Sequence, residues 1–145
     1  MDAVKIPDDM YERVFGFATG LTNASEAGDT KTYWQLYSEF AVYCEAEAAR
    51  DHPFLWETLA DFTTDDQASV ALYVKALASA KRLSATEYEA SILFALAERY
   101  NDIGNKALSY RYALEANDKA KALDDLALRR SISEFLLRES SNTSA

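Results

Sequence analysis

Apolar side chains recur with a helical period along most of the chain. Between residues 88 and 100, and again between residues 109 and 123, they stand three and four positions apart. This spacing is typical of an amphipathic helix that buries one face. Gly104 and Asn105 separate the two runs; glycine ends a helix readily in the left-handed conformation, and asparagine caps the next one. The pattern therefore predicts a helical hairpin over residues 84–123.

Residues with capping chemistry stand before several of the apolar runs. Ser84 followed by Glu87 makes a capping box, and the segment 64–67 offers a second one. Pro7 and Pro53 precede two further runs, and proline is tolerated in the first turn because its nitrogen needs no hydrogen bond there. Together with the turns, these starts predict seven helices and no strand.

The predicted helices repeat along the chain at a shift of 38 residues. This shift relates three turn positions, Gly28, Asp66 and Gly104. It also places Ala78 on Ala116, where a small side chain would let a neighbouring helix approach closely. The register predicts three antiparallel hairpins, followed by an unpaired seventh helix that covers the end of the array.

The hairpin over residues 84–123 resembles the tetratricopeptide-repeat family, in which a large-x-x-Leu-small-x-x-Tyr helix precedes a helix with small inner residues. The positions that match this pattern are Leu93, Leu96, Ala97, Tyr100, Ser109 and Ala116. Ala113 replaces the usual aromatic residue, no proline closes the repeat, and the period exceeds the family's usual length of about 34 residues. The resemblance implies an all-α fold, a right-handed α-α superhelix (a TPR-like solenoid) of three helical hairpins plus a C-terminal capping helix. Generic antiparallel hairpins are the alternative.

Length and composition favour one compact domain. A chain of 145 residues with 49% hydrophobic side chains can bury a substantial core. We expect a single TPR-like domain over residues 1–139 and a disordered polar tail over residues 140–145.

The charge of the chain limits its partners. The formal net charge is −9, and such a surface repels nucleic acids and anionic membranes. An acidic surface suits a basic protein or peptide partner instead. A homo-oligomer is compatible with the same features.

The sequence also indicates a compartment. No apolar run is long enough to span a bilayer, and the first residues contain no apolar segment of the kind that directs secretion. Cys44 is the only cysteine, so no internal disulfide can form. These features predict a cytoplasmic protein.

Residues with catalytic chemistry are few. The chain has one histidine, His52, and one cysteine, Cys44, which are too few for a hydrolytic triad or a zinc site of the usual composition. Its glycines are scattered, so no phosphate-binding loop is formed. We expect no cofactor, no metal and no enzymatic activity; the rival hypothesis is an enzyme that uses Glu98 and Asp102, which share a helix face.

The leading functional hypothesis is a module that binds a partner protein or peptide. In the family that this chain resembles, the first helices of successive repeats line a concave groove. The candidate partner-binding residues at these positions are Phe15, Trp56, Phe94, Glu98, Asn101 and Asp102. Trp56 and Phe94 fall beside the inward stripes of their helices, so they are either partly exposed anchors, as the binding hypothesis requires, or packed under a neighbouring helix. The two acids would favour a basic partner.

Two narrower hypotheses fit the same size, charge and helical repeats. One is an immunity protein that neutralises a toxic effector, and the other is a secretion-type chaperone that holds an unfolded segment. The segment 30–50 has an aromatic face that includes Tyr33 and Tyr37, with Trp34 beside them. Core packing explains this face more readily than a ligand site does.

Overall fold

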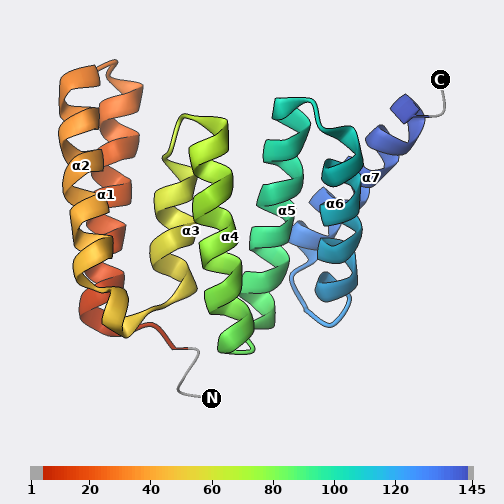
Figure 1. The fold of residues 1–145 in the computed structure, drawn as a ribbon, viewed down its shortest axis with the longest axis horizontal. Coiled ribbons are helices and arrows are strands. Elements are labelled where there is room, and N and C mark those ends of the chain that lie inside the picture. Colours follow the sequence, from red (N-terminus) through yellow and green to blue (C-terminus); the bar gives the residue numbers. More distant parts are fainter. Residues whose placement is uncertain (1–4, 144–145) are drawn as a thin grey trace.

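The computed structural model describes residues 5–143 of the chain, with the side chains of residues 5–139. This part contains seven α-helices, one short 3-10 helix and no strand (Figure 1), which confirms the prediction of an all-helical protein. The helices are α1 (Asp8–Glu26), α2 (Thr30–Ala46), α3 (Pro53–Asp61), α4 (Asp66–Arg82), α5 (Thr86–Ile103), α6 (Lys106–Ala120) and α7 (Leu126–Thr143), and the 3-10 helix is η2 (Ala48–Arg50).

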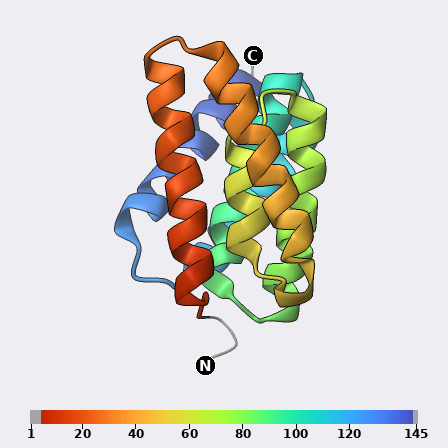
Figure 2. The same cartoon turned by 90° about the vertical axis from the view of Figure 1, so that its left-hand side faces the viewer.

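Each helix packs against the next one in the chain, so α1–α2, α3–α4 and α5–α6 form three hairpins that lie side by side (Figure 1). Helix α3 also contacts α1 and α5. In Figure 2, α1 and α7 lie on the left of the molecule, whereas α2 and α4 lie on the right. We call the side formed by α1, α3, α5 and the start of α7 the odd-helix face.

One continuous core joins the hairpins. Its buried side chains run from Met10 in α1 to Ile132 in α7. Within the first hairpin, the rings of Phe17 and Phe40 stack with their centroids 4.9 Å apart. A core shared by all hairpins fixes how the odd-numbered helices stand relative to one another.

Two of the predicted turns form as local chemistry requires. Gly28 and Gly104 both adopt a positive φ, of 68° and 92°, where a side chain would be strained. Asn105 caps α6, because its Oδ1 accepts a hydrogen bond from the amide of Leu108 at 3.1 Å. The turn between α5 and α6 is therefore the one that the sequence predicts.

Both predicted capping boxes are wrong. Ser84 has φ 53° and its side chain caps nothing, because it lies in the turn that ends α4, where the amide of Ala85 bonds to the carbonyl of Ala80 at 2.9 Å. Helix α4 is capped by Asp65, which accepts from the amide of Ala68 at 2.8 Å. In both places the helix begins one residue later than the capping box requires.

The uniform 38-residue register is wrong in the second helix of the middle hairpin. Buried serine hydroxyls mark equivalent positions, since Ser69 donates to the carbonyl of Ala60 at 2.9 Å and Ser109 donates to that of Ala97 at 2.7 Å. The shift would have placed Ala71 on Ser109. Helix α3 has 9 residues and α5 has 18, so the chain reaches α4 sooner and its inward face is displaced.

The ends of two helices also differ from the predictions. Helix α2 ends at Ala46, and the predicted continuation to Arg50 is the separate η2. Helix α7 continues to Thr143, so it extends four residues into the segment 140–145 that we expected to be a tail; the remainder of that segment lies outside the described residues.

Because the register of α4 is displaced, Ala78 and Ala116 differ in burial, and the same substitution at each provides a matched test. Ala116 is fully buried, whereas Ala78 is exposed, which corrects the prediction that both face a neighbouring helix. We expect Ala116→Leu to overpack the contact and lower the free energy of unfolding by about 1–3 kcal/mol. Ala78→Leu should change it by less than about 0.5 kcal/mol. Urea denaturation measures both, and equal midpoints for the two variants would contradict this assignment.

Candidate partner-binding face

Aromatic rings form an exposed strip on the odd-helix face. Tyr11 and Phe15 of α1 are 46% and 56% exposed, and their ring centroids lie 6.0 Å apart. The ring of Tyr11 also stacks on Phe54 of α3 at 5.7 Å. The strip therefore crosses from the first hairpin to the second, and contiguous exposed apolar surface of this kind is typical of interaction sites.

A carboxyl group lies one helical turn beyond this strip. Glu57 of α3 is half-buried, and the hydroxyl of Ser91 in α5 donates to its Oε2 at 2.6 Å. Burial raises the pKa of Glu57 to about 7; the hydrogen bond from Ser91 opposes this rise, and the charge of Asp61 adds to it. No lysine or arginine among residues 5–139 forms an ion pair with Glu57.

Tyr88 of α5 belongs to the same surroundings. Burial raises the pKa of its phenol first, and the negative charges of Glu57 and Glu87 and the phenol of Tyr11 raise it further. Tyr11 of α1 stacks on Phe54, and Ser91 of α5 bonds to Glu57, so side chains from α1 and α5 both contact the stretch of α3 that carries Glu57. Its neighbours there are aromatic, hydroxylic or acidic.

A pocket of about 470 Å³ extends from Ser91 toward the start of α7. Its lining residues are Glu87, Ser91, Ala122, Leu123, Asp124, Asp125 and Leu128. The first residue of α7, Leu126, is 72% exposed. Apolar and acidic side chains thus continue along the odd-helix face beyond α5.

The polar residues predicted on α5 come together, but they face α7. Glu98, Asn101 and Asp102 line a pocket of about 330 Å³ whose other wall is Phe135, Arg138 and Glu139. Burial raises the pKa of Glu98, and the charge of Asp102 adds to this effect. Arg138 opposes it, so part of the acidic surface that the sequence assigned to a partner faces an arginine of the chain itself.

The aromatic residues predicted for the site differ in how far they are exposed. Phe94 is half-buried and meets the ring of Phe135 edge-on at 5.6 Å. Phe15, on α1, is 56% exposed. Trp56 is 1% exposed, so the expectation that it is a partly exposed anchor is wrong.

The position of α3 explains the burial of Trp56. This helix contacts α1, α2, α4 and α5, so little of its circumference reaches solvent. The Trp56 Nε1 donates to Asp51 at 2.7 Å, and the Nζ of Lys75 lies 3.7 Å from the ring centroid. An indole with both a hydrogen bond and a cation–π contact is part of the structure.

His52 and Cys44 also have structural positions. The Nδ1 of His52 accepts from the amide of Phe54 at 3.1 Å and so caps α3, and the buried ring meets Tyr88 edge-on at 5.2 Å. Cys44 is buried in the first hairpin, and burial raises the pKa of its thiol to about 12. A thiol with this pKa is not a nucleophile at neutral pH.

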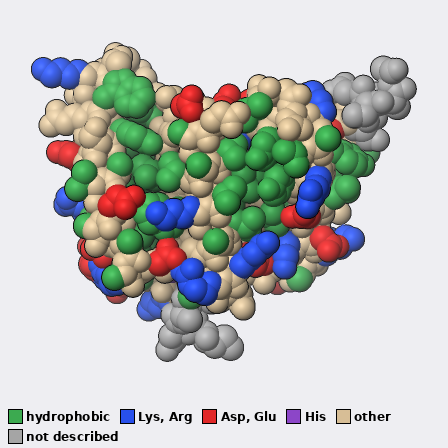
Figure 3. All heavy atoms as spheres, viewed as in Figure 1, with side chains coloured by type: hydrophobic (Ala, Val, Ile, Leu, Met, Phe, Trp, Pro, Cys, Tyr) green, Lys and Arg blue, Asp and Glu red, His purple; other side chains and the backbone are tan. Residues whose placement is uncertain are grey.

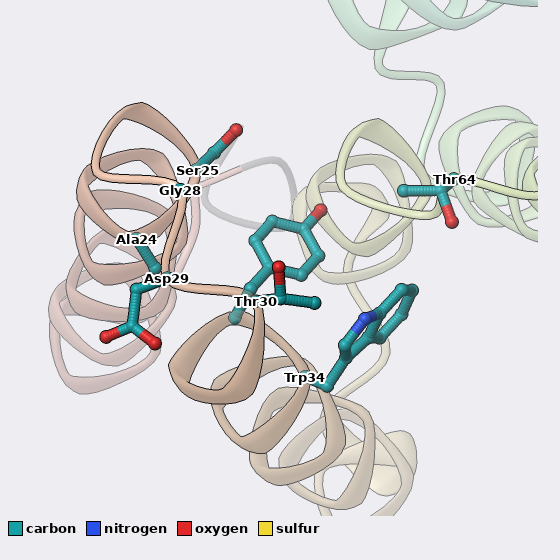
Figure 4. Close-up of a pocket in the computed structure, with 8 residues that line it drawn as sticks. Ala24, Ser25, Gly28, Asp29, Thr30, Trp34 and Thr64 are labelled. Carbon is teal, nitrogen blue, oxygen red and sulfur yellow. The ribbon is translucent and has the colours of Figure 1, made fainter.

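A third, smaller hollow lies at the other end of the first hairpin. It has a volume of about 260 Å³, and its lining residues are Ala24, Ser25, Gly28, Asp29, Thr30, Tyr33, Trp34 and Thr64 (Figure 4). Trp34 is 46% exposed. The hydroxyl of Tyr33 donates to the carbonyl of Phe62 at 2.6 Å, and the carboxylate of Asp29 caps α2 through the amide of Thr32. Because both polar groups already serve the fold, this hollow is the weaker candidate.

Hydrophobic side chains also gather on the opposite side of the molecule, over α4–α6 (Figure 3). Val74 of α4 and Leu114 of α6 are 47% and 46% exposed. Neither residue lines the two pockets along α5 described above. Leu114 is therefore a useful control position for the odd-helix face.

The sequence reading missed the residues around Glu57. Phe54 and Tyr88, like Glu57 and Ser91, stand 34 residues apart, which is about the usual tetratricopeptide period. A search at that period in addition to 38 would have paired them. The contact between Glu57 and Ser91 itself depends on how α3 and α5 pack, and the spacing of residues in the sequence does not specify that packing.

The burial of Trp56 predicts that its removal destabilises the fold. Trp56→Ala should leave a large cavity and lower the free energy of unfolding by about 3–5 kcal/mol. Phe15→Ala, which removes an exposed ring, should cost less than about 1 kcal/mol. Thermal and urea melts of both variants test this, and similar stabilities would contradict the burial of Trp56.

The raised pKa of Glu57 predicts a specific pH dependence of stability. A carboxyl whose pKa is higher in the folded than in the unfolded protein destabilises the fold once it ionises, so its contribution is lost as pH rises from about 4.5 to about 7. We expect Glu57→Gln to raise the free energy of unfolding by about 1–3 kcal/mol at pH 8 and by almost nothing at pH 4. A pH-independent difference in urea stability would show that the charge is not responsible.

Comparison of the chain with protein-family models, with curated proteins and with solved structures found no significant match. Among the described residues, no helix has both the length and the apolar character needed to cross a bilayer.

Proposed function

We propose that this protein binds a basic partner protein or peptide through its odd-helix face and does not catalyse a reaction. The observation that carries the proposal is the exposed strip of Phe15 and Tyr11, which continues onto Phe54 and ends beside Glu57. Exposed aromatic rings supply the apolar anchors that dominate binding energy. The neighbouring carboxyl group favours a partner of positive charge.

The extent of the face favours a polypeptide over a small molecule. Apolar and acidic side chains follow one another from α1 across α3 and α5 to the start of α7, and the two pockets along α5 lie on the same path. A net charge of −9 would accelerate the approach of a basic partner through long-range attraction. Raised salt should therefore slow association more than it speeds dissociation.

The proposal includes a right-handed superhelix of the tetratricopeptide type, in which the first helix of each hairpin lines the inner surface. Two observations support it. The hairpins pack in sequence order, and α3 contacts the odd-numbered helix on either side. The serines at corresponding positions of α4 and α6, Ser69 and Ser109, make the same bond to the preceding helix. We also propose a cytoplasmic location, for which the buried thiol of Cys44 is suited.

The proposal predicts that Phe15 is an anchor for the partner. A partner recovered from the native host with the wild-type chain should bind Phe15→Ala with about 2 kcal/mol less affinity, the scale of an interface hot spot. Leu114→Ala, which removes a similarly exposed side chain from the other side of the molecule, should bind within about 0.5 kcal/mol of wild type. Calorimetric titration of the purified partner measures both affinities.

Melting curves of the two variants provide the folding control. Equal affinities of wild type and Phe15→Ala would remove the odd-helix face from the interaction. A loss confined to Leu114→Ala would move the binding site to the surface over α4–α6.

A further inference from the structure

We propose that the odd-helix face recognises an arginine side chain of its partner, whose guanidinium pairs with Glu57 against the rings of Tyr11, Phe54 and Tyr88. This inference rests on the proposed function and names the chemistry of the partner at that site. An arginine supplies a planar cation that stacks on aromatic faces and offers paired donors to a carboxylate.

Among residues 5–139, Glu57 differs from the other half-buried or buried carboxylates because it forms no ion pair with a lysine or arginine. Asp66 pairs with Arg99 at 3.0 Å, and the buried Glu89 pairs with Lys119 at 3.1 Å. Asp51 pairs with Arg82. Glu57 has the hydroxyl of Ser91 on Oε2, which leaves its Oε1 available to a donor from outside the chain.

The groups that face Glu57 favour a cation and oppose an anion. Asp61 lies on its own helix, Tyr88 on α5 is in electrostatic contact with it, and Glu87 and Tyr11 surround Tyr88. All four side chains are acidic or phenolic. A guanidinium entering here would meet a carboxylate that forms no ion pair within residues 5–139, close to aromatic rings, which attract positive charge.

A metal ion is a poorer fit to this arrangement. One carboxylate and one hydroxyl are fewer oxygen ligands than calcium or magnesium requires. No group of three potential metal-ligating side chains is assembled among the described residues. The aromatic neighbours, which do not serve a hard cation, instead match the flat face of a guanidinium.

The first test uses a defined probe and the full chain. N-acetyl-arginine N-methylamide is titrated into ¹⁵N-labelled protein at pH 8, and the citrulline analogue, which has nearly the same shape but no charge, is titrated as its control. We expect the arginine probe to shift the amides around Glu57, Tyr88 and Ser91, and to bind at least about tenfold more tightly than the citrulline probe.

Variants and pH then identify the carboxylate. Glu57→Gln should reduce binding of the arginine probe about tenfold, whereas Glu134→Gln, an equal change of charge at an exposed position on α7, should leave it unchanged. Because Glu57 gains a proton near pH 7, wild type should bind about tenfold more weakly at pH 6 than at pH 8. Glu57→Gln should bind equally at both values.

Each contrary outcome has a distinct meaning. Equal binding of the arginine and citrulline probes, or shifts centred on another surface, would overturn the arginine site without any variant being needed. Partner binding that depends on Phe15 but is unchanged by Glu57→Gln would keep the proposed function and overturn this inference. Partner binding that ignores Phe15, with the arginine probe still bound at Glu57, would overturn the proposed function instead.

Discussion

The middle hairpin is tied to both of its neighbours at the end of α3, and the geometry of the odd-helix face depends on these ties. The hydroxyl of Tyr33, from α2, donates to the carbonyl of Phe62 at 2.6 Å. Arg99, from α5, donates to the carbonyl of Thr63 at 3.3 Å and pairs with Asp66 at 3.0 Å. These carbonyls lie just beyond the end of a helix, where no intrahelical donor reaches them. Side chains from the adjacent hairpins satisfy them, and so join local helix ends to the packing of the whole array.

Ion pairs join helices at several junctions of the array. Arg99, Arg82 and Lys119 each neutralise a carboxylate at a junction between helices. An ion pair of this kind offsets the cost of removing each charge from water. Glu57 lies at a similar junction, between α3 and α5, yet its hydrogen-bond partner is the neutral Ser91. The fold thus compensates its desolvation with one hydrogen bond and no ion pair, which is why we assign this position to recognition.

Helix α7 faces the acidic residues of α5 that the sequence assigned to a partner. Arg138 and Phe135 of α7 face Glu98 and Phe94, so that side chains expected to be open to a partner have neighbours within the chain. The more exposed aromatic surface lies on α1 instead, where the rings of Tyr11 and Phe15 are 46% and 56% exposed. The exposed aromatic rings that could serve as anchors are therefore on α1 rather than on α5.

The sequence by itself determined the features that depend on a few adjacent residues. The helices follow from the period of apolar side chains, the turns from the positive φ of Gly28 and Gly104, and one cap from Asn105. Tertiary structure decided the rest, because burial depends on what surrounds a helix. Trp56 is covered since α3 has helices on several sides. Glu57 acquires its raised pKa from an environment that α3 and α5 create together, and no local pattern in either segment contains that information.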